Sequence, residues 1–455
     1  MEDRKIYAGA AMADITPPMG TALGVDLWPH YARFIHDPLH AKALVLKQDE
    51  LTVAIVIVDI CIMGTDLMDD IKSRIHSHTG IHPKNILLAS NHDHAAANVV
   101  GLLGNGVDID YRLKLPNLVV KAVKLAKEKL KPAKIASGSV DVPEYVLCRR
   151  YLMKEGYEAK NPVTHKNDQV KTNPFGGEDM IVGPAGIPDP GLSFLAIKGL
   201  DDRWISVLGN YSLHYVSDWH DDSITADYFG EFSKQIKEKL HADDNFVGIM
   251  SNGTSGDVNI WDFINPDRFP KEHFAKSELI GGALSQKVIE ELSKVIWHNN
   301  PALAVQYEEL ELAVRKPSDG ELEAAKKAFI ENDFDNLSLK DDAVQRIYDR
   351  EQIMLNEYPD TFIAPVQSIK IGNLVIGALP GEFFSETGHY LKKSITSHNY
   401  FSISLANAYG GYIPPAHEHE RGGYETWRAR SSFMETGAEE KIRVTLIELI
   451  RKLTS

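Results

Sequence analysis

The 455-residue sequence predicts an α+β fold with mixed α/β layers, in which mixed sheets are flanked by helices in one large domain. Runs rich in β-branched and aromatic residues are interspersed with segments of helical periodicity. Polar turns at 199–203 and 372–373 each separate two such runs, which is typical of antiparallel hairpins. Because hairpins and crossover helices are mixed, the pattern favours layered sheets over a purely parallel one.

Each expected strand is a short apolar run bounded by Gly, Asp, Asn or Lys. β-Branched and aromatic side chains fit a pleated, half-buried surface, so these runs favour strands. In chain order they are residues 40–46, 52–58, 85–90, 133–140, 192–199, 204–215, 245–251, 302–312, 366–379 and 400–406.

Helices are expected where apolar residues recur every three or four positions. Segments 66–80, 111–130, 227–240, 276–296 and 439–453 have this pattern, and a helix-like stretch begins at 383. Two more polar segments, 319–332 and 341–358, predict a surface helical pair.

The chain shows no internal repeat and no Pro/Gly/Ser-rich linker, so we expect one domain over residues 1–455. The Gly/Pro-rich stretch 173–191 is interpreted as a long ordered loop. Loops of that length without secondary structure are often functional.

Composition and charge exclude some classes of partner. The 49 Lys+Arg against 64 Asp+Glu give a net charge of −15, and no dense basic block is present, so we expect no nucleic acid partner. No apolar stretch reaches the ~20 residues of a membrane span. No basic amphipathic segment would dock onto anionic lipid, so we expect no stable membrane association either.

The expected compartment follows from the N-terminus and the cysteines. Cys61 and Cys148 match no metal or redox spacing and are expected to be buried free thiols. The opening MEDRKIYAGA lacks the apolar core of a signal peptide, which predicts a cytoplasmic protein, or a secreted or periplasmic one if a leader has been removed. The oligomeric state stays open.

Two histidines, His92 and His94, follow the apolar run 85–90. Residues i and i+2 on a strand face the same side, so both imidazoles can address one site if the strand continues that far. Neutral imidazole is the commonest metal ligand in proteins. A catalytic zinc site needs about three protein ligands, however, and an isolated pair can also simply cap a strand end.

Further candidates stand where other apolar strands end. His214 lies late in the segment 204–215, and Glu382 follows a strand that breaks at a Pro-Gly pair, where a helix begins. A carboxylate at a helix N-terminus stays ionised, which suits a ligand, although a plain helix-start glutamate fits as well. The loop 407–425 concentrates aromatic and ionisable side chains, as active-site walls do.

Short motifs along nearly the whole chain occur in the order seen in one enzyme family. This ordered set resembles the catalytic domain of the neutral ceramidases, zinc amidases that cleave the N-acyl bond of ceramide. That family's C-terminal immunoglobulin-like domain is not expected here. The motifs are GAAMADITPPMG (9–20), SNHDHAAA (90–97), NYSLHYVS (210–217), ITADYFGEF (224–232), SNGTSGDVN (251–259), LPGEFF (379–384), NAYGGYIPP (407–415) and GGYE (422–425).

The resemblance implies a site with one zinc ion per chain. Nitrogen and oxygen ligands suit zinc and leave a position for water, whose pKa the metal lowers towards ~7. By position in the motifs, the ligands would be His92, His214, Glu382 and Tyr412, with His94 as general base and Tyr424 polarising the scissile carbonyl.

This sequence departs from the family at one motif and suggests its own substrate contacts. Asn259 stands where the family has a serine, so a mechanism needing that hydroxyl is unavailable, whereas a metal-activated water is not. Asn259 is expected to contact the substrate. Arg149 and Arg150 could clamp a carboxylate or other anionic group, or could form structural ion pairs instead.

Two aspartates lie in turns near the motifs. Asp14 and Asp257 could orient the ligand histidines through their free ring nitrogens, as residues behind metal ligands often do. Turn formation alone would explain both aspartates equally well.

The leading hypothesis is a zinc-dependent hydrolase that acts on an amide bond of a small substrate, N-acylated or anionic, possibly carbohydrate-derived, and not necessarily ceramide. One alternative keeps the metal but uses a Tyr/His pair for elimination, as a carbohydrate lyase does. Another is a catalytically silent metal-binding homologue, because a fold does not guarantee the function usually found on it.

Overall fold

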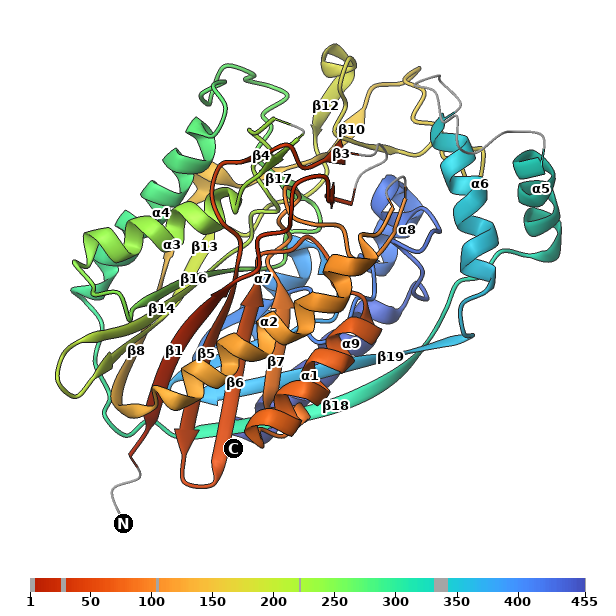
Figure 1. The fold of residues 1–455 in the computed structure, drawn as a ribbon. Coiled ribbons are helices and arrows are strands. Elements are labelled where there is room, and N and C mark those ends of the chain that lie inside the picture. Colours follow the sequence, from red (N-terminus) through yellow and green to blue (C-terminus); the bar gives the residue numbers. More distant parts are fainter. Residues whose placement is uncertain (1–4, 26–29, 104–105, 221, 331–342, 455) are drawn as a thin grey trace.

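An eight-stranded sheet is the central element of the fold (Figure 1). The computed structural model describes residues 5–25, 30–103, 106–220, 222–330 and 343–454. Only the outer pairs, β14 with β16 and β6 with β7, are parallel. The order is β16 (Val247–Asn252), β14 (Trp204–Tyr211), β13 (Gly191–Gly199), β8 (Lys131–Asp141), β1 (Tyr7–Asp14), β5 (His40–Gln48), β6 (Leu51–Val58) and β7 (Ile86–Ser90).

Helices cover one face of this sheet. Figure 1 shows α2 (Ile109–Glu128) lying across β1, β5 and β6, next to α1 (Thr65–Thr79). Farther along the sheet, α3 (Asp227–Lys239) contacts β16, and α4 (Ala275–Leu292) contacts α3 and β8. The sheet therefore has a helical layer on one side.

A second sheet packs on the other face. Its order is β18 (Leu303–Ala313), β19 (Thr361–Ile371), β20 (Leu374–Ala378) and β22 (Asn399–Ile403). Side chains alternate along β5: Ala43 and Val45 face the helices, whereas Leu44 and Leu46 share a core with the second sheet. Helix α9 (Ala438–Thr454) covers the far side of the second sheet, so helices enclose two stacked sheets.

Small ribbons and helices surround one end of the layers. They include β9 (Leu147–Cys148) with β17 (Val258–Asn259), and β21 (Glu382–Phe383) with β23 (Tyr412–Ile413). A three-stranded sheet contains β10 (Arg150–Met153), β11 (Val170–Thr172) and β12 (Ile181–Pro184). The remaining short elements are β2 (Ala22–Leu23), β3 (His30–Tyr31), β4 (Phe34–Ile35), β15 (Ser223–Ile224), α5 (Asp319–Ile330), α6 (Ala343–Asn356), α7 (Ser385–Ser394) and α8 (Ala416–Arg421).

The predicted α+β class with mixed layers is confirmed. Both predicted hairpins form, one joining β13 to β14 and the other β19 to β20. The predicted helices are present as well, except that parts of the polar pair fall within 331–342, outside the described residues. Both cysteines are buried free thiols, as expected.

Two local predictions are wrong, and one strand was not predicted. Strand β7 ends at Ser90, as its predicted range does, and so does not reach His92, whereas β14 ends at Tyr211, short of the predicted end at 215 and before His214. The segment 173–191 is not entirely a loop, because it contains β12 and the start of β13. Strand β1 was not expected, since its sequence YAGAAMAD is rich in alanine and has little strand preference of its own. Pairing with β5 along its whole length decides its conformation.

No helix among the described residues combines the length and the apolar character needed to cross a lipid bilayer.

A buried ion pair fixes the chain where β6 ends. The ammonium group of Lys42 lies 2.9 and 3.0 Å from the two carboxylate oxygens of Asp59. The same carboxylate accepts the backbone N–H of His40 and the side-chain amide of Asn91, each at 2.8 Å. Since Asn91 immediately precedes His92, this pair also fixes the backbone from which His92 projects.

The Asp59→Ala substitution is expected to lower the free energy of unfolding by about 3–5 kcal/mol, because it leaves the Lys42 ammonium buried without a counter-ion. Urea denaturation followed by circular dichroism measures the loss. The control is Asp201→Ala, since Asp201 pairs with Lys131 at 3.4 Å where both are exposed. A loss of the same size in both variants would contradict the prediction.

Candidate metal centre

Two candidate ligand histidines are oriented by backbone carbonyl groups. His92 has a positive φ of 76°, and its Nδ1 lies 3.0 Å from the carbonyl oxygen of Cys61. His214 Nδ1 lies 3.1 Å from the carbonyl oxygen of Ser255. A carbonyl only accepts, so each Nδ1 donates its proton and each Nε2 carries a lone pair. The two Nε2 atoms face each other at 2.9 Å.

Side-chain and backbone contacts bring the two histidines together from opposite ends of the large sheet. His92 follows β7, whereas His214 follows β14. The side-chain amide of Asn252, at the end of β16, donates to the backbone carbonyls of Asn91 and His214, each at 3.2 Å. One asparagine thus connects the two histidine-bearing segments.

A carboxylate and a phenol come from a two-residue parallel ribbon. Glu382 of β21 is in register with Tyr412 of β23. Glu382 Oε2 lies 3.4 Å from Nε2 of His92 and 3.7 Å from Nε2 of His214. This oxygen is buried and has no hydrogen-bond partner among the described residues. Its lone pair faces the centre.

The donor set fits a divalent metal ion. Ligand atoms bonded to zinc at about 2.0–2.1 Å in a tetrahedron are about 3.3 Å apart. The separations of 2.9, 3.4 and 3.7 Å among the two Nε2 atoms and Glu382 Oε2 bracket that spacing. Three lone pairs directed at one buried point repel each other unless a cation lies between them. The residues present therefore suit zinc, with Tyr412 adjacent.

Burial sets the protonation states at this centre. It lowers the pKa of His92 and His214 well below the ordinary value, and neighbouring imidazoles and Arg149 lower it further. Burial also raises the pKa of Glu382 to about 7, against the opposing effects of Arg149 and Tyr412. The imidazoles are thus neutral, which is the form that binds metals.

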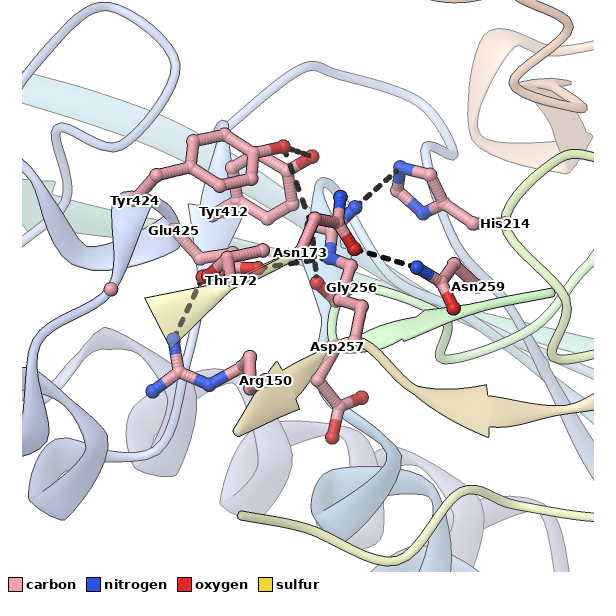
Figure 2. Close-up of polar contacts among 12 residues, drawn as sticks. Arg150, Thr172, Asn173, His214, Gly256, Asp257, Asn259, Tyr412, Tyr424 and Glu425 are labelled. Atoms are coloured by element: carbon pink, nitrogen blue, oxygen red, sulfur yellow. Dashed lines mark hydrogen bonds and ion pairs between the residues drawn. The ribbon is translucent and has the colours of Figure 1, made fainter. Parts of the chain in front are cut away.

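Arg149 lies beside His214 and the Tyr412–Tyr424 pair, whose hydroxyl groups Figure 2 shows next to each other. One guanidinium nitrogen is 3.2 Å from His214 Nε2, and another donates to the Tyr424 hydroxyl at 3.3 Å and to the Gly256 carbonyl at 2.7 Å. The hydroxyl groups of Tyr412 and Tyr424 are hydrogen-bonded to each other. Burial raises the pKa of both phenols well above the ordinary value, so both remain neutral donors.

Glu425 holds the two arginines in place from behind. Its carboxylate accepts from Arg149 at 2.9 Å, from Arg150 at 2.7 Å and from the Thr172 hydroxyl at 2.7 Å. Burial would raise the pKa of Glu425, but Arg149 and Arg150 lower it, so it stays charged. Arg150 also pairs with Glu418 at 2.7 Å. Arg150 is therefore in the structural ion pairs that were the alternative to a substrate clamp.

His94 connects the centre to a large cavity. Its Nε2 is 3.2 Å from His92 Nε2, and its ring stacks on Tyr215 with the ring centroids 3.9 Å apart. Tyr215 in turn contacts Trp261 and Trp219, which both line a cavity of about 990 Å³. His94 is half-buried, so it lies between the buried ligands and open space.

The structure brings together seven of the predicted site residues, although His92 and His94 do not share one face of a strand. His92 and His94 follow the strand rather than lying on it, and the left-handed backbone at His92 turns both rings toward one point. Asn259 lies on β17, where its amide contacts Asn173. The seven are His92, His94, His214, Glu382, Tyr412, Tyr424 and Arg149.

The orienting role predicted for Asp14 and Asp257 is wrong, because backbone carbonyls occupy both histidine Nδ1 positions. Asp14 is exposed and accepts the backbone N–H of Thr16 in a turn. Asp257 accepts the backbone N–H of Ser385 at 2.7 Å and its hydroxyl at 2.9 Å, so it fixes the start of α7.

Sequence reasoning missed Glu425, Tyr215 and Asn173. Glu425 and Tyr215 each directly follow a residue that the motifs identified, but their contacts are with partners distant in the sequence. Nothing in the sequence around Asn173 indicates its contact with Asn259.

Comparison with known proteins supports the same class of fold. No protein-family model matches the chain, and no curated protein matches its sequence. Two solved structures do resemble it across 99% of its length at 15% identity. One is described as a ceramidase complexed with C2, with a TM-score of 0.71 over 76% of that chain. The other is neutral ceramidase from Pseudomonas aeruginosa, with a TM-score of 0.72 over 75% of that chain.

The protein thus has the fold of the neutral ceramidases, with a group of side chains that could hold a metal ion where the small ribbons meet the two sheets. The resemblance that the sequence motifs indicated is confirmed for the fold. At this level of identity the activity and substrate are separate questions.

The Glu425→Gln substitution is expected to lower the free energy of unfolding by about 3–5 kcal/mol, since it removes the shared counter-charge of two buried arginines. Chemical denaturation measures the loss, with the exposed Glu440→Gln as control. Adding Arg150→Met should recover part of the loss, because the two opposite charges are then removed together. Simple additivity of the two substitutions would contradict the prediction.

Proposed function

We propose that the protein is a zinc-dependent hydrolase that cleaves an amide bond in a small N-acylated substrate, not necessarily ceramide. The observation that carries this proposal is the convergence of two neutral imidazole Nε2 atoms and an unpartnered carboxylate oxygen in a buried centre. His92, His214 and Glu382 would hold one zinc ion per chain, with Tyr412 as the fourth ligand.

When bound, zinc would lower the pKa of a water molecule towards ~7 and polarise the scissile carbonyl. An amide is a poor electrophile, so its cleavage needs both an activated water molecule and a polarised carbonyl group. The chain's own residues supply the proton transfers and the orientation.

His94 is proposed as the general base. Its Nε2 lies 3.2 Å from His92 Nε2, next to the centre, and the Tyr215 ring fixes its plane by stacking. A histidine in that position can take the proton of the attacking water and return it to the leaving amine. Its partial exposure suits contact with substrate.

Tyr424 and Arg149 are proposed to stabilise the charge that develops on the carbonyl oxygen. Tyr424 is a neutral phenol that can donate a hydrogen bond, and Arg149 donates to it at 3.3 Å. Donors that are already in place cost no reorganisation during the reaction, which is why such groups accelerate acyl transfer.

Metal content provides the first test. Protein purified without added metal is expected to contain about one zinc per chain by elemental analysis, and the His92→Ala, His214→Ala double variant none. The matched control, His76→Ala with His78→Ala, removes two exposed histidines on α1 and should keep the metal. A folded parent protein without metal would overturn the proposal and favour a binding protein.

Catalysis provides the second test. With a cleaved N-acyl substrate in hand, Tyr424→Phe is expected to lower kcat by about 10²–10³-fold with unchanged zinc content, since it removes one oxyanion donor. Amine release measures the rate, and Tyr7→Phe, an exposed tyrosine on β1, is the control. A product with ultraviolet absorbance and no new amine would instead indicate elimination. Unchanged kcat in Tyr424→Phe would exclude its proposed role.

A further inference from the structure

Two tryptophans beside the candidate centre belong to the wall of a large cavity. Trp219 and Trp261 both line the cavity of about 990 Å³, and each is half-buried. Their ring centroids lie 6.1 and 6.2 Å from that of Tyr215, whose ring stacks on His94. Tyr215 directly follows His214, and the same segment continues to Trp219. One stretch of chain therefore forms part of both the centre and the cavity wall.

The cavity wall presents aromatic rings to a ligand. Phe175 lies between Trp261 and Phe263, with ring centroids 5.3 and 4.9 Å away, and 64% of its surface remains exposed. Aromatic side chains offer a broad apolar surface with a defined geometry. A ring-shaped ligand with C–H groups on one face can pack against such a wall.

Three polar side chains on the same wall have no hydrogen-bond or ion-pair partner among the described residues. The Asp179 carboxylate accepts hydrogen bonds, the Lys276 ammonium donates them, and the Asn265 amide does both. A ligand that satisfies all three must donate at some positions and accept at others. Hydroxyl groups do this, because each has one donor and two lone pairs.

The other ionic groups of the wall are largely used within the chain. Asp262 pairs with Arg268 at 3.2 Å, and Lys271 pairs with Asp267. Asp218 accepts two backbone N–H groups at the start of α4, at 2.6 and 2.9 Å. An acidic ligand would still meet carboxylates, and a cation would meet the free ammonium group. An uncharged ligand with hydroxyl groups avoids both repulsions.

We propose that this cavity binds a carbohydrate, so that the substrate of the candidate centre is a saccharide with an N-acylated amino group. Sugar rings combine a face of C–H groups with hydroxyl groups that donate and accept. The N-acyl group in this assignment rests on the proposed amide hydrolysis, whereas the carbohydrate site does not. Hydrolysis would add water across the amide, leave a free amino group on the sugar and release the acyl group as a carboxylic acid.

Binding is measured by calorimetry on the protein as purified, with ligands that contain no amide and cannot be cleaved. Cellobiose and maltose are compared with putrescine, a cation, and with 1-hexanol, which represents an acyl chain. At least one disaccharide is expected to bind about 10-fold or more tightly than putrescine and hexanol.

Trp261→Ala tests the aromatic wall. It is expected to weaken disaccharide binding by about 10-fold or more, whereas Trp261→Phe, which keeps a ring, should retain most of the affinity. Trp297→Ala is the matched control, because Trp297 is also half-buried but contacts Trp204 at 5.8 Å and does not line the cavity.

Asp179 provides a second pair of variants, at an exposed position where folding is not at risk. Asp179→Asn keeps an oxygen that can accept from a sugar hydroxyl, so the affinity should stay within about 3-fold of the parent. Asp179→Ala removes the acceptor and should weaken binding by about 3–10-fold. Equal losses in both variants would indicate a cationic ligand and contradict the inference.

The carbohydrate site and the proposed hydrolysis fail in distinguishable ways. Absence of disaccharide binding, tighter binding of putrescine or hexanol, or an unchanged affinity in Trp261→Ala overturns the carbohydrate site even if the protein cleaves other amides. Disaccharide binding that is lost in Trp261→Ala and retained in Trp261→Phe supports the site even if no amine is released from N,N′-diacetylchitobiose, an outcome that would count against amide hydrolysis alone.

Discussion

The candidate site depends on a repulsion that the fold imposes. Two imidazole Nε2 atoms, each left with a lone pair because its Nδ1 donates to a carbonyl, are held 2.9 Å apart beside an unpartnered carboxylate oxygen. Arg149 reaches one of the lone pairs, at 3.2 Å from His214 Nε2, but Glu382 Oε2 has no hydrogen-bond partner among the described residues. The arrangement persists because the backbone determines it: the turn at His92, the Asn252 bridge and the two-residue ribbon of Glu382 are fixed by contacts outside the centre. A centre organised in advance in this way gains free energy when a cation binds, instead of losing it to rearrangement.

Around the centre, charge is balanced residue by residue, which is what allows so many ionisable groups to be buried. Glu425 forms ion pairs with both Arg149 and Arg150, and Glu418 pairs with Arg150 from the other side. Each guanidinium therefore avoids the cost of an unpaired buried charge. Arg149 is thereby fixed so that its remaining donors reach His214 and Tyr424. The same network joins segments far apart in the sequence, so the packing of the ribbons also determines the geometry of the site.

Much of the fold and the main ligand candidates could be predicted from the sequence, because apolar runs that end in His or Glu are a local signal. The strand β1 could not, since its alanine-rich residues acquire their conformation from pairing with β5. The atoms that orient the histidines could not be predicted either, because every residue has a backbone carbonyl and the sequence does not distinguish the ones that accept these hydrogen bonds. The aspartates in nearby turns were therefore chosen instead, and that choice was wrong. The role of Glu425 was hidden because its partner Arg150 lies 275 positions away.

The asparagine at position 259 changes more than the loss of a serine hydroxyl suggests. A hydroxyl rotates and can exchange its donor and acceptor directions, whereas an amide has its donor and its acceptor on different atoms. With Asn259, the direction of the polar contacts is therefore set by the backbone N–H of Trp261 and carried without ambiguity to Asn173. The end of this chain of contacts can only donate. The direction of the polar contacts at Asn173 is thus determined by the backbone at the exit of β17.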